Sequence, residues 1–231
     1  MIRNYQDFLE ALRMSGFSMG GGNDDGIYSI ISWGWNENSP YETPVKWHTG
    51  DIDTDPWEWR MRVLDEETDI AYAKVFFKKS GFITKDLYPQ FLAVRRQGLS
   101  FKETYDDGCM SYETKRIYEV IASEKQIPIH LLKEKTGFGK ENQSAFDRAL
   151  VELQMKLFVT LSGHQRKVSK TGDEYGWSST VLTTTECFFG ADVFKKAEKL
   201  TIEEAYSQIE AQILRVNPTA QAKKMKKFIT G

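Results

Sequence analysis

The spacing of hydrophobic residues predicts an alternation of helices and extended segments in the first half of the chain. Between Asn4 and Gly16, apolar residues recur at helical spacing and a glycine follows the last of them, as in a short amphipathic helix. After this helix at 4–16 we expect a flexible glycine-rich connection at 18–26 and a strand or packed extended segment at 27–35. A helix at 57–67, a β-hairpin at 71–84 that turns at KKSG, and a helix at 85–98 are expected to follow.

The second half of the chain shows a clearer pattern. Apolar spacing predicts three helices in close succession, over residues 111–125, 127–138 and 142–157. A stretch rich in β-branched residues then predicts a hairpin over 158–186, with its turn at TGDEYG. Three helices followed by a hairpin are typical of a winged helix, in which the third helix reads a DNA groove and the hairpin forms the wing.

These elements indicate an α+β fold that is mostly helical, with winged-helix elements (helix-turn-helix plus β-hairpin wing) in tandem. The polar, acidic stretch SFKETYDDG is expected to be a linker between domains. We therefore expect an N-terminal α+β region at 1–104 that is a degenerate winged helix, a winged-helix domain at 105–190, and C-terminal packing helices at 191–231. In the last region, a capping box from Thr201 to Glu204 predicts a packing helix.

Composition narrows the classes of protein that the chain could represent. The formal net charge is −2, so a nucleic-acid role requires a local basic face. The apolar runs are far shorter than a membrane span, and acids near the N-terminus interrupt any signal-peptide pattern, so we expect no membrane partner and a cytoplasmic location. Cys109 and Cys187 are far apart and are expected to be buried thiols rather than a disulfide or zinc ligands. No cofactor is expected.

The stretch WHTGDIDTDPWEWRMR, residues 47–62, concentrates candidate chemistry. Its alternating aspartates match the first, third and fifth ligands of a calcium loop, but Pro56 and Arg62 occupy the positions that require glycine and glutamate, so no metal site is expected. Instead Asp55 is suited to cap a helix, with Pro56 at the first helical position and Glu58 reaching back to the cap.

The same stretch also has the residues of a binding pocket. Trp57 and Trp59 point to different sides of a helix, which predicts one buried ring and one ring at a pocket or interface. The candidate pocket residues are Trp47, Trp57, Trp59 and Arg60, and the candidate catalytic residues are His48, Asp51, Asp53 and Asp55. The alternative is a small aromatic core whose charges are satisfied.

Candidate DNA contacts lie on the third helix and the wing of the second half. They are Asn142, Gln143, Ser144 and Arg148 on the helix, and His164, Arg166, Lys167 and Lys170 on the wing. Alternatively, Asn142 or Ser144 caps the helix, with Asp147 closing a capping box, and the wing lysines are solvated. The C-terminal KKMKK could contact phosphates, but we favour a solvated helix end whose lysines complement the dipole.

Several of these segments resemble a known family. DPWEWRMRVLDEETDIAYAKVFFKKSGFIT, SYETKRIYEVI and SAFDRALVELQMKLFVTLSG are similar to the AlkZ/YcaQ-type winged-helix DNA glycosylases of crosslink and alkylation repair, and more closely to their AlkZ-related branch. The resemblance implies tandem winged helices, DNA as partner, and in catalytic members a Gln-x-Gln or Gln-x-Asp pair that positions water. Here no glutamine is followed two residues later by glutamine or aspartate.

Three functional hypotheses follow. The first is a DNA-binding protein, related to these glycosylases, that lacks their catalytic pair. The second is an active glycosylase, a hydrolase of N-glycosidic bonds, that uses an aspartate of the 51–55 loop. The third is a non-enzymatic winged-helix interaction module, for which we expect a mixed-charge third helix and an exposed apolar patch. Whether the protein is an enzyme stays open at this stage.

Overall fold

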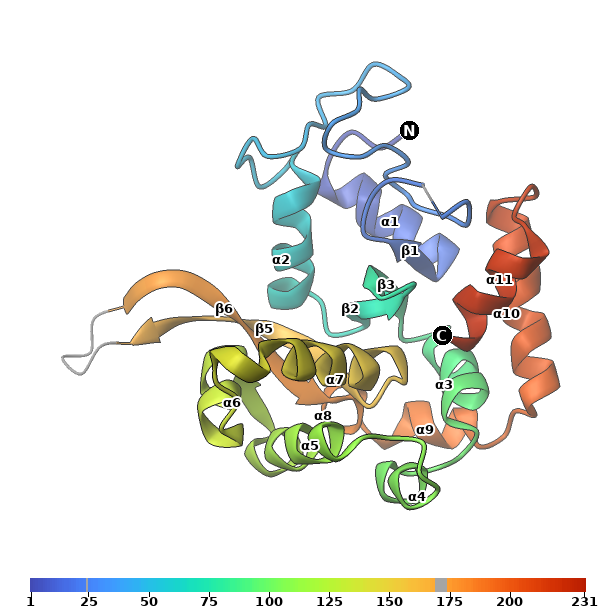
Figure 1. Cartoon of the computed structure of the whole chain (residues 1–231). Helices are drawn as coiled ribbons and strands as arrows, with labels where there is room; N and C mark the ends of the chain where they lie inside the picture. The colour runs from blue at the N-terminus through green and yellow to red at the C-terminus, as the bar shows by residue number, and fades with distance from the viewer. Residues whose placement is uncertain (24, 169–173) are drawn as a thin grey trace.

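Two small antiparallel sheets with the same strand arrangement organise the fold (Figure 1). The computed structural model describes residues 1–23, 25–168 and 174–231, and the side chains of 166–168 and 174–178 lie outside that description. The first sheet has the order β1-β3-β2, and the second has the order β4-β6-β5. The six strands are β1 (Phe17–Met19), β2 (Ile70–Phe76), β3 (Lys79–Thr84), β4 (Gln126–Pro128), β5 (Val159–Val168) and β6 (Glu174–Thr184).

The helices before each sheet follow a common order. We call the first sheet with its two helices the first unit, and the second sheet with its helices the second unit. In the first unit, α1 (Tyr5–Ser15) precedes β1, and α2 (Pro56–Glu66) precedes the β2–β3 hairpin. In the second unit the corresponding helices are α5 and α7, and a further helix, α6, lies between them. The bounds are α5 (Tyr112–Glu124), α6 (Ile129–Thr136), the short η1 (Lys140–Asn142) and α7 (Gln143–Met155). The described part of 20–55 contains neither helix nor strand, so an irregular segment stands in the first unit where α6 stands in the second.

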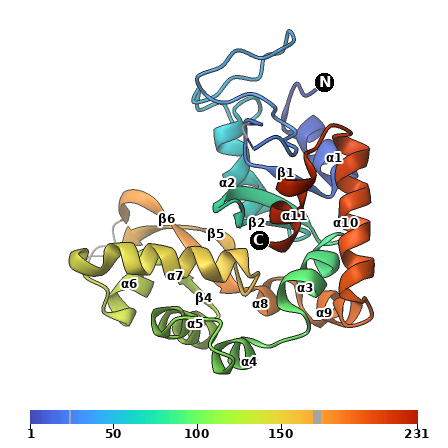
Figure 2. The same ribbon diagram turned by 45° about the vertical axis from the view of Figure 1, so that its right-hand side comes forward.

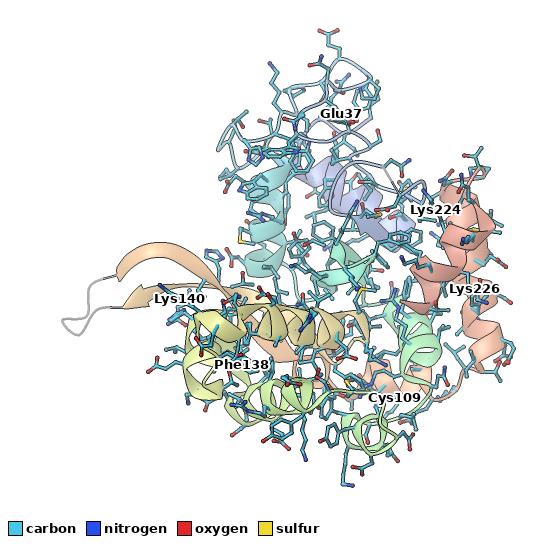
Figure 3. All side chains as sticks on the ribbon, in the orientation of Figure 1. Glu37, Cys109, Phe138, Lys140, Lys224 and Lys226 are labelled. Atoms are coloured by element: carbon cyan, nitrogen blue, oxygen red, sulfur yellow. The ribbon has the colours of Figure 1, made fainter. Side chains whose placement is uncertain are left out.

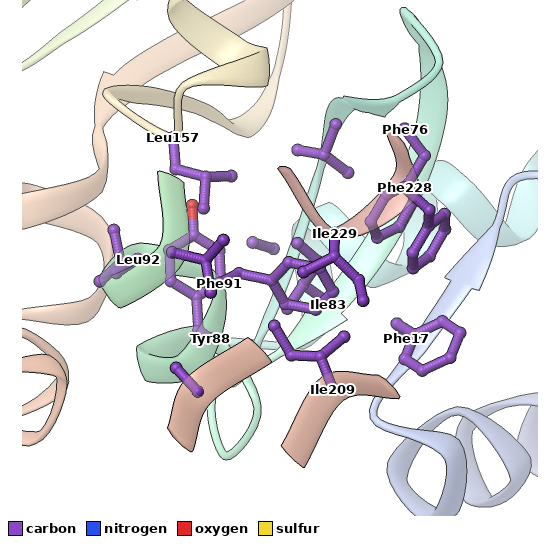
Figure 4. Packing of buried hydrophobic residues seen from close by; sticks show 14 of the residues in the cluster. Phe17, Phe76, Ile83, Tyr88, Phe91, Leu92, Leu157, Ile209, Phe228 and Ile229 are labelled. Atoms are coloured by element: carbon purple, nitrogen blue, oxygen red, sulfur yellow. The ribbon is translucent and has the colours of Figure 1, made fainter. Parts of the chain in front are cut away.

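The remaining helices join the two units. They are α3 (Tyr88–Arg96), α4 (Phe101–Asp106), α8 (Thr185–Phe189), α9 (Ala191–Ala197), α10 (Ile202–Val216) and α11 (Ala222–Thr230). Both α9 and α10 pack on α3, and α11 lies against α3 and α10 (Figure 2). Figure 4 shows the core that results, in which the rings of Phe76 and Phe228 stack with centroids 3.8 Å apart. The C-terminal helices therefore share one core with the first sheet.

Most of the expected elements are confirmed, as is the mostly helical α+β class. The Thr201 and Glu204 side chains form the capping box at the start of α10. Residues 27–35 form a packed extended segment rather than a strand, with Ile27, Ile31 and Trp33 buried. No helix in the described part of the chain combines the length and the apolar character needed to cross a membrane.

Three expectations are wrong in detail. The stretch predicted to be a linker contains α4, which begins with a capping box between Ser100 and Glu103. The hairpin turns at Phe77 and Lys78, whose φ angles of 51° and 62° suit a two-residue turn, and not at KKSG. Both cysteines are exposed free thiols, because each lies on the outer side of a short loop or helix rather than in the core.

Candidate functional site

A cavity of about 380 Å³ opens beside the first sheet. Its walls come from the end of β1, the irregular segment, the first turn of α2 and the β2–β3 hairpin. The lining residues are Met19, Gly20, Gly21, Gly34, Trp35, Trp47, His48, Pro56, Trp57, Arg60, Tyr72, Lys79 and Ser80. Pockets that bind small ligands have volumes of roughly 300–1,000 Å³ and are mostly apolar with a few polar groups, and this cavity has both properties.

Five aromatic side chains line the cavity, Trp35, Trp47, His48, Trp57 and Tyr72, and His48 lies near the three tryptophans. The imidazole lies 4.7 Å from the Trp57 ring, 5.4 Å from Trp35 and 6.4 Å from Trp47, measured between centroids. Trp35 is 68% exposed and Trp57 is 42% exposed. Large aromatic side chains that stay this exposed beside a cavity are typical of a surface that binds a partner or ligand.

A buried carboxylate holds this arrangement in place. Asp55 is fully buried and accepts hydrogen bonds from the backbone N–H groups of Trp57 at 2.8 Å, Gly50 at 2.9 Å and His48 at 3.0 Å. His48 has φ of 59°, a left-handed backbone conformation that residues other than glycine rarely adopt. Such backbone strain persists where surrounding contacts enforce it, so Asp55 positions the aromatic wall.

The first turn of α2 follows its local sequence. Asp55 caps the helix and Pro56 lies at its start, as expected. The backbone N–H of Asp55, which Glu58 was expected to bind, donates instead to the carbonyl of Asp51. Asp55 therefore caps α2 without a capping box, and its backbone N–H is part of the hydrogen bonding within the 51–55 loop.

Cations lie at the cavity, and no carboxylate is among the described residues that line it. The Arg60 guanidinium lies 3.3 Å from the centroid of the Trp57 ring, and its Nε donates to the Trp57 carbonyl at 2.9 Å. Lys79 approaches from the hairpin and pairs with Asp25 at 2.9 Å. A planar, electron-rich ligand with a neighbouring negative charge suits an aromatic cavity flanked by these cations.

Glycines allow the walls to approach one another. Gly21 has φ of 153°, and a Cβ at this position would lie 2.5 Å from the Trp47 ring. The N–H of Gly20 donates to the carbonyl of Ser80 at 2.9 Å, and a Cβ on Gly20 would lie 3.0 Å from the same oxygen. Gly20 and Gly21 thus provide close backbone packing within the glycine-rich stretch.

The other candidates from the 47–62 stretch lie away from the cavity. Trp59 is 1% exposed and packs in the core against Phe8, with ring centroids 5.2 Å apart. Asp51 accepts the backbone N–H of Asp53 at 2.8 Å, and the Asp53 carboxylate lies 3.8 Å from an Arg62 nitrogen. Within the described residues, no group of three or more His, Cys, Asp or Glu side chains has an arrangement suited to a metal ion.

The candidates on α7 lie on a surface of mixed charge. Asn142 and Ser144 are exposed, while Gln143 accepts from Lys133 at 2.9 Å and donates to Asp147 at 2.6 Å. The Asn142 side chain makes no capping hydrogen bond, and Ser144 lies inside α7, so neither of the two alternative caps is formed. Arg148 borders a groove of about 770 Å³ that also contains Lys78, Lys156, Glu113, Asp147 and Glu152.

The wing candidates are described only in part. The β5–β6 hairpin extends outward beyond α2 (Figure 1). His164 on β5 lies with its Nδ1 3.3 Å from a carboxylate oxygen of Asp65 on α2. The side chains of Arg166 and Lys167, and the whole of Lys170, lie outside the described residues.

Comparison with known proteins assigns the chain to a family. The family model described as AlkZ related matches residues 2–230. The chain belongs to the AlkZ-related family. No curated protein and no solved structure matches it.

Only four of the thirteen described residues that line the cavity of this AlkZ-related protein, Trp47, His48, Trp57 and Arg60, were candidates from the sequence. Trp35, Tyr72, Lys79 and Ser80 line it, but none of them was a candidate. Trp35 was detectable in principle, because SWGW places an aromatic ring beside a glycine in an otherwise apolar segment. Lys79 and Ser80 reach the cavity only through the pairing of β1 with β3.

Proposed function

We propose that this AlkZ-related protein binds DNA and holds an unpaired base in the cavity formed by Trp35, Trp47, His48 and Trp57. The observation that carries the proposal is the aromatic cavity flanked by Arg60 and Lys79. An unpaired base presents a flat π face to such rings, and stacking of one base on an aromatic side chain contributes about 1–3 kcal/mol. The cations suit the adjoining phosphates.

The family and the topology support DNA as the partner. Members that this chain resembles act on DNA, and we infer that residues 112–184 form a winged helix. The order helix, strand, helix, helix, hairpin and the strand order β4-β6-β5 support that inference. The first unit repeats the order with the irregular segment in place of the middle helix, which supports a degenerate second copy.

We assign the main contact to the cavity rather than to α7. The exposed side of α7 and its groove combine Arg148 and Lys156 with Asp147 and Glu152. Such mixed charge is poorly suited to phosphate binding and also fits an interaction module. DNA contact stays a prediction for all eight candidates, Asn142, Gln143, Ser144, Arg148, His164, Arg166, Lys167 and Lys170.

Replacement of Trp57 by alanine tests the cavity. We expect Trp57→Ala to bind a duplex with one unpaired base about tenfold more weakly than the unchanged protein does, because one stacking surface is lost. Binding to the fully paired duplex should change little. Fluorescence anisotropy with both labelled duplexes measures this difference, and thermal unfolding checks that the variant is folded.

Tyr112→Ala provides a matched control, because Tyr112 is also an exposed aromatic residue, 63% exposed, but lies on α5 away from the cavity. It should leave both affinities unchanged. Equal loss by Trp57→Ala on paired and unpaired DNA would contradict base binding in the cavity. No binding of the unchanged protein to either duplex at low salt would contradict DNA binding altogether.

We further propose that base binding occurs without hydrolysis of the glycosidic bond. Asp51, Asp53 and Asp55 do not line the cavity, and Asp55 already accepts three backbone N–H groups. Incubation with DNA that contains an N-alkylated purine or a crosslink should therefore yield no abasic sites on alkaline cleavage. Product formation that is lost in Asp51→Asn or Asp53→Asn would instead support the glycosylase alternative.

A further inference from the structure

Six lysines form a basic surface beside the cavity, which we call the lysine surface. One lies in the turn of the β2–β3 hairpin, one is the first residue of β3, and four lie on α11. They are Lys78, Lys79, Lys223, Lys224, Lys226 and Lys227. Figure 3 labels Lys224 and Lys226 on α11, of which Lys226 is exposed and Lys224 half-buried. On the opposite side of α11, Met225, Phe228 and Ile229 are buried.

Contacts between three segments bring these lysines together. The Lys227 ammonium lies 5.7 Å from the centroid of the Phe77 ring in the hairpin turn. The Lys224 ammonium lies beside Gly26, at 3.7 Å from the position of a Cβ there. The Asn217 side chain, just before α11, donates to the carbonyl of Ile27. The hairpin turn, residues 25–27 and the start of α11 thus form one continuous surface.

The charge on this surface is strongly unbalanced. Residues 25–27, 76–80 and 217–231 contain six lysines and a single acidic side chain, Asp25, which is paired with Lys79. The uncompensated charges on one surface add up to a positive potential, which attracts a polyanion. The chain as a whole has a net charge of −2, so the positive potential is local.

The helix dipole does not account for the lysines of α11. Cations are favourable at the C-terminal end of a helix and unfavourable at its N-terminal end. Lys227 lies in the last turn of α11, but Lys223 and Lys224 lie in the first turn, where no acidic residue offsets them. Their placement costs helix stability, so the interpretation that we favoured from the sequence, a solvated helix end, explains only part of the KKMKK stretch.

The lysine surface is continuous with the aromatic cavity. Lys79 belongs to both, since it lines the cavity and follows Lys78 in the hairpin turn. A strand whose base lies between the tryptophans would therefore have its neighbouring phosphates at Lys79, with the remaining lysines further along the same surface.

We propose that the lysine surface binds the phosphate backbone of the DNA strand that carries the unpaired base, and leads that strand to the cavity. This inference rests on the proposed function, because it requires DNA as the ligand. It adds the four lysines of α11, which line neither the cavity nor the groove on α7.

The test compares two triple variants with the same change in charge. In Lys223→Gln/Lys226→Gln/Lys227→Gln, exposed lysines of the surface are neutralised, while Lys79 and the half-buried Lys224 are kept. In Lys195→Gln/Lys196→Gln/Lys199→Gln, exposed lysines at and just after α9 are neutralised. The probe is a labelled single-stranded oligonucleotide, titrated at several salt concentrations.

We expect the α11 variant to bind more weakly and to lower the slope of log affinity against log salt by about 2, because each phosphate contact on single-stranded DNA contributes about 0.7. The α9 variant should keep the slope of the unchanged protein. Equal slopes for both variants and the unchanged protein would overturn the inference, as would an equal decrease in both variants, which would indicate a general charge effect.

A second measurement separates this inference from the proposed function. For the α11 variant, the ratio of affinities for the unpaired-base duplex and the fully paired duplex should equal that of the unchanged protein, because the cavity is intact. If the unchanged protein binds no DNA, the proposed function fails. If it binds DNA and prefers the unpaired base, yet the α11 variant keeps the full salt slope, the lysine surface alone is refuted.

Discussion

Replacement of Asp55 by alanine is expected to lower the free energy of unfolding by about 3 kcal/mol, because three backbone N–H groups lose a charged acceptor. Two of those groups belong to His48 and Gly50, which have left-handed φ angles of 59° and 75°. Without the carboxylate, His48 should leave its position between the tryptophans. The variant should therefore also lose its preference for DNA with an unpaired base. Chemical denaturation and the two-duplex titration measure these effects.

Two further variants sharpen this prediction. Asp55→Asn keeps the shape but places an NH₂ group opposite one of the N–H donors, so a loss of about 1–2 kcal/mol is expected. Asp53→Asn is the control, because its exposed carboxylate lies 3.8 Å from Arg62 and should contribute little. If Asp55→Ala unfolds like the unchanged protein, Asp55 does not organise the cavity wall.

Local signals in the sequence predicted the elements that depend on a few neighbouring residues. Asp55 before Pro56 predicted the start of α2, and helical spacing placed Trp57 and Trp59 on different sides of it. Both outcomes follow from the geometry of one helix, which is fixed within a single turn. The same holds for the Thr201 and Glu204 capping box.

The rest of the site depends on contacts between distant segments, which spacing does not reveal. Gly20 meets Ser80 because β1 pairs with β3, and Gly21 makes room for Trp47. A glycine-rich stretch has the same composition whether it is flexible or closely packed, so its role required the structure. The lysines of α11 likewise acquire a role only through their position beside the β2–β3 turn.

Among the contacts that hold the two units together, the side chain of Arg95 is expected to contribute most to the free energy of unfolding. This α3 side chain donates to the carbonyls of Val75 at 2.7 Å, Met155 at 2.9 Å, Phe228 at 2.6 Å and Ile229 at 2.9 Å. These acceptors belong to β2, the end of α7 and the last turn of α11, where helix carbonyls have no partner within the helix. Burial lowers the pKa of Arg95 to about 9, because removal from water disfavours the charged form.

Arg95→Met should lower the free energy of unfolding by about 4 kcal/mol, since the apolar stem is kept but four carbonyls lose their donor. Arg95→Lys should recover only part of the loss. Its ammonium can still donate hydrogen bonds, but it cannot reach carbonyls from three segments as a planar guanidinium does. Lys102→Met, at an exposed ion pair on α4, should change stability by less than about 1 kcal/mol. A cooperative denaturation curve for each variant measures these differences. If Arg95→Met and Lys102→Met destabilise the protein equally, the joint depends on apolar packing around Phe76 and Phe228 and not on this guanidinium.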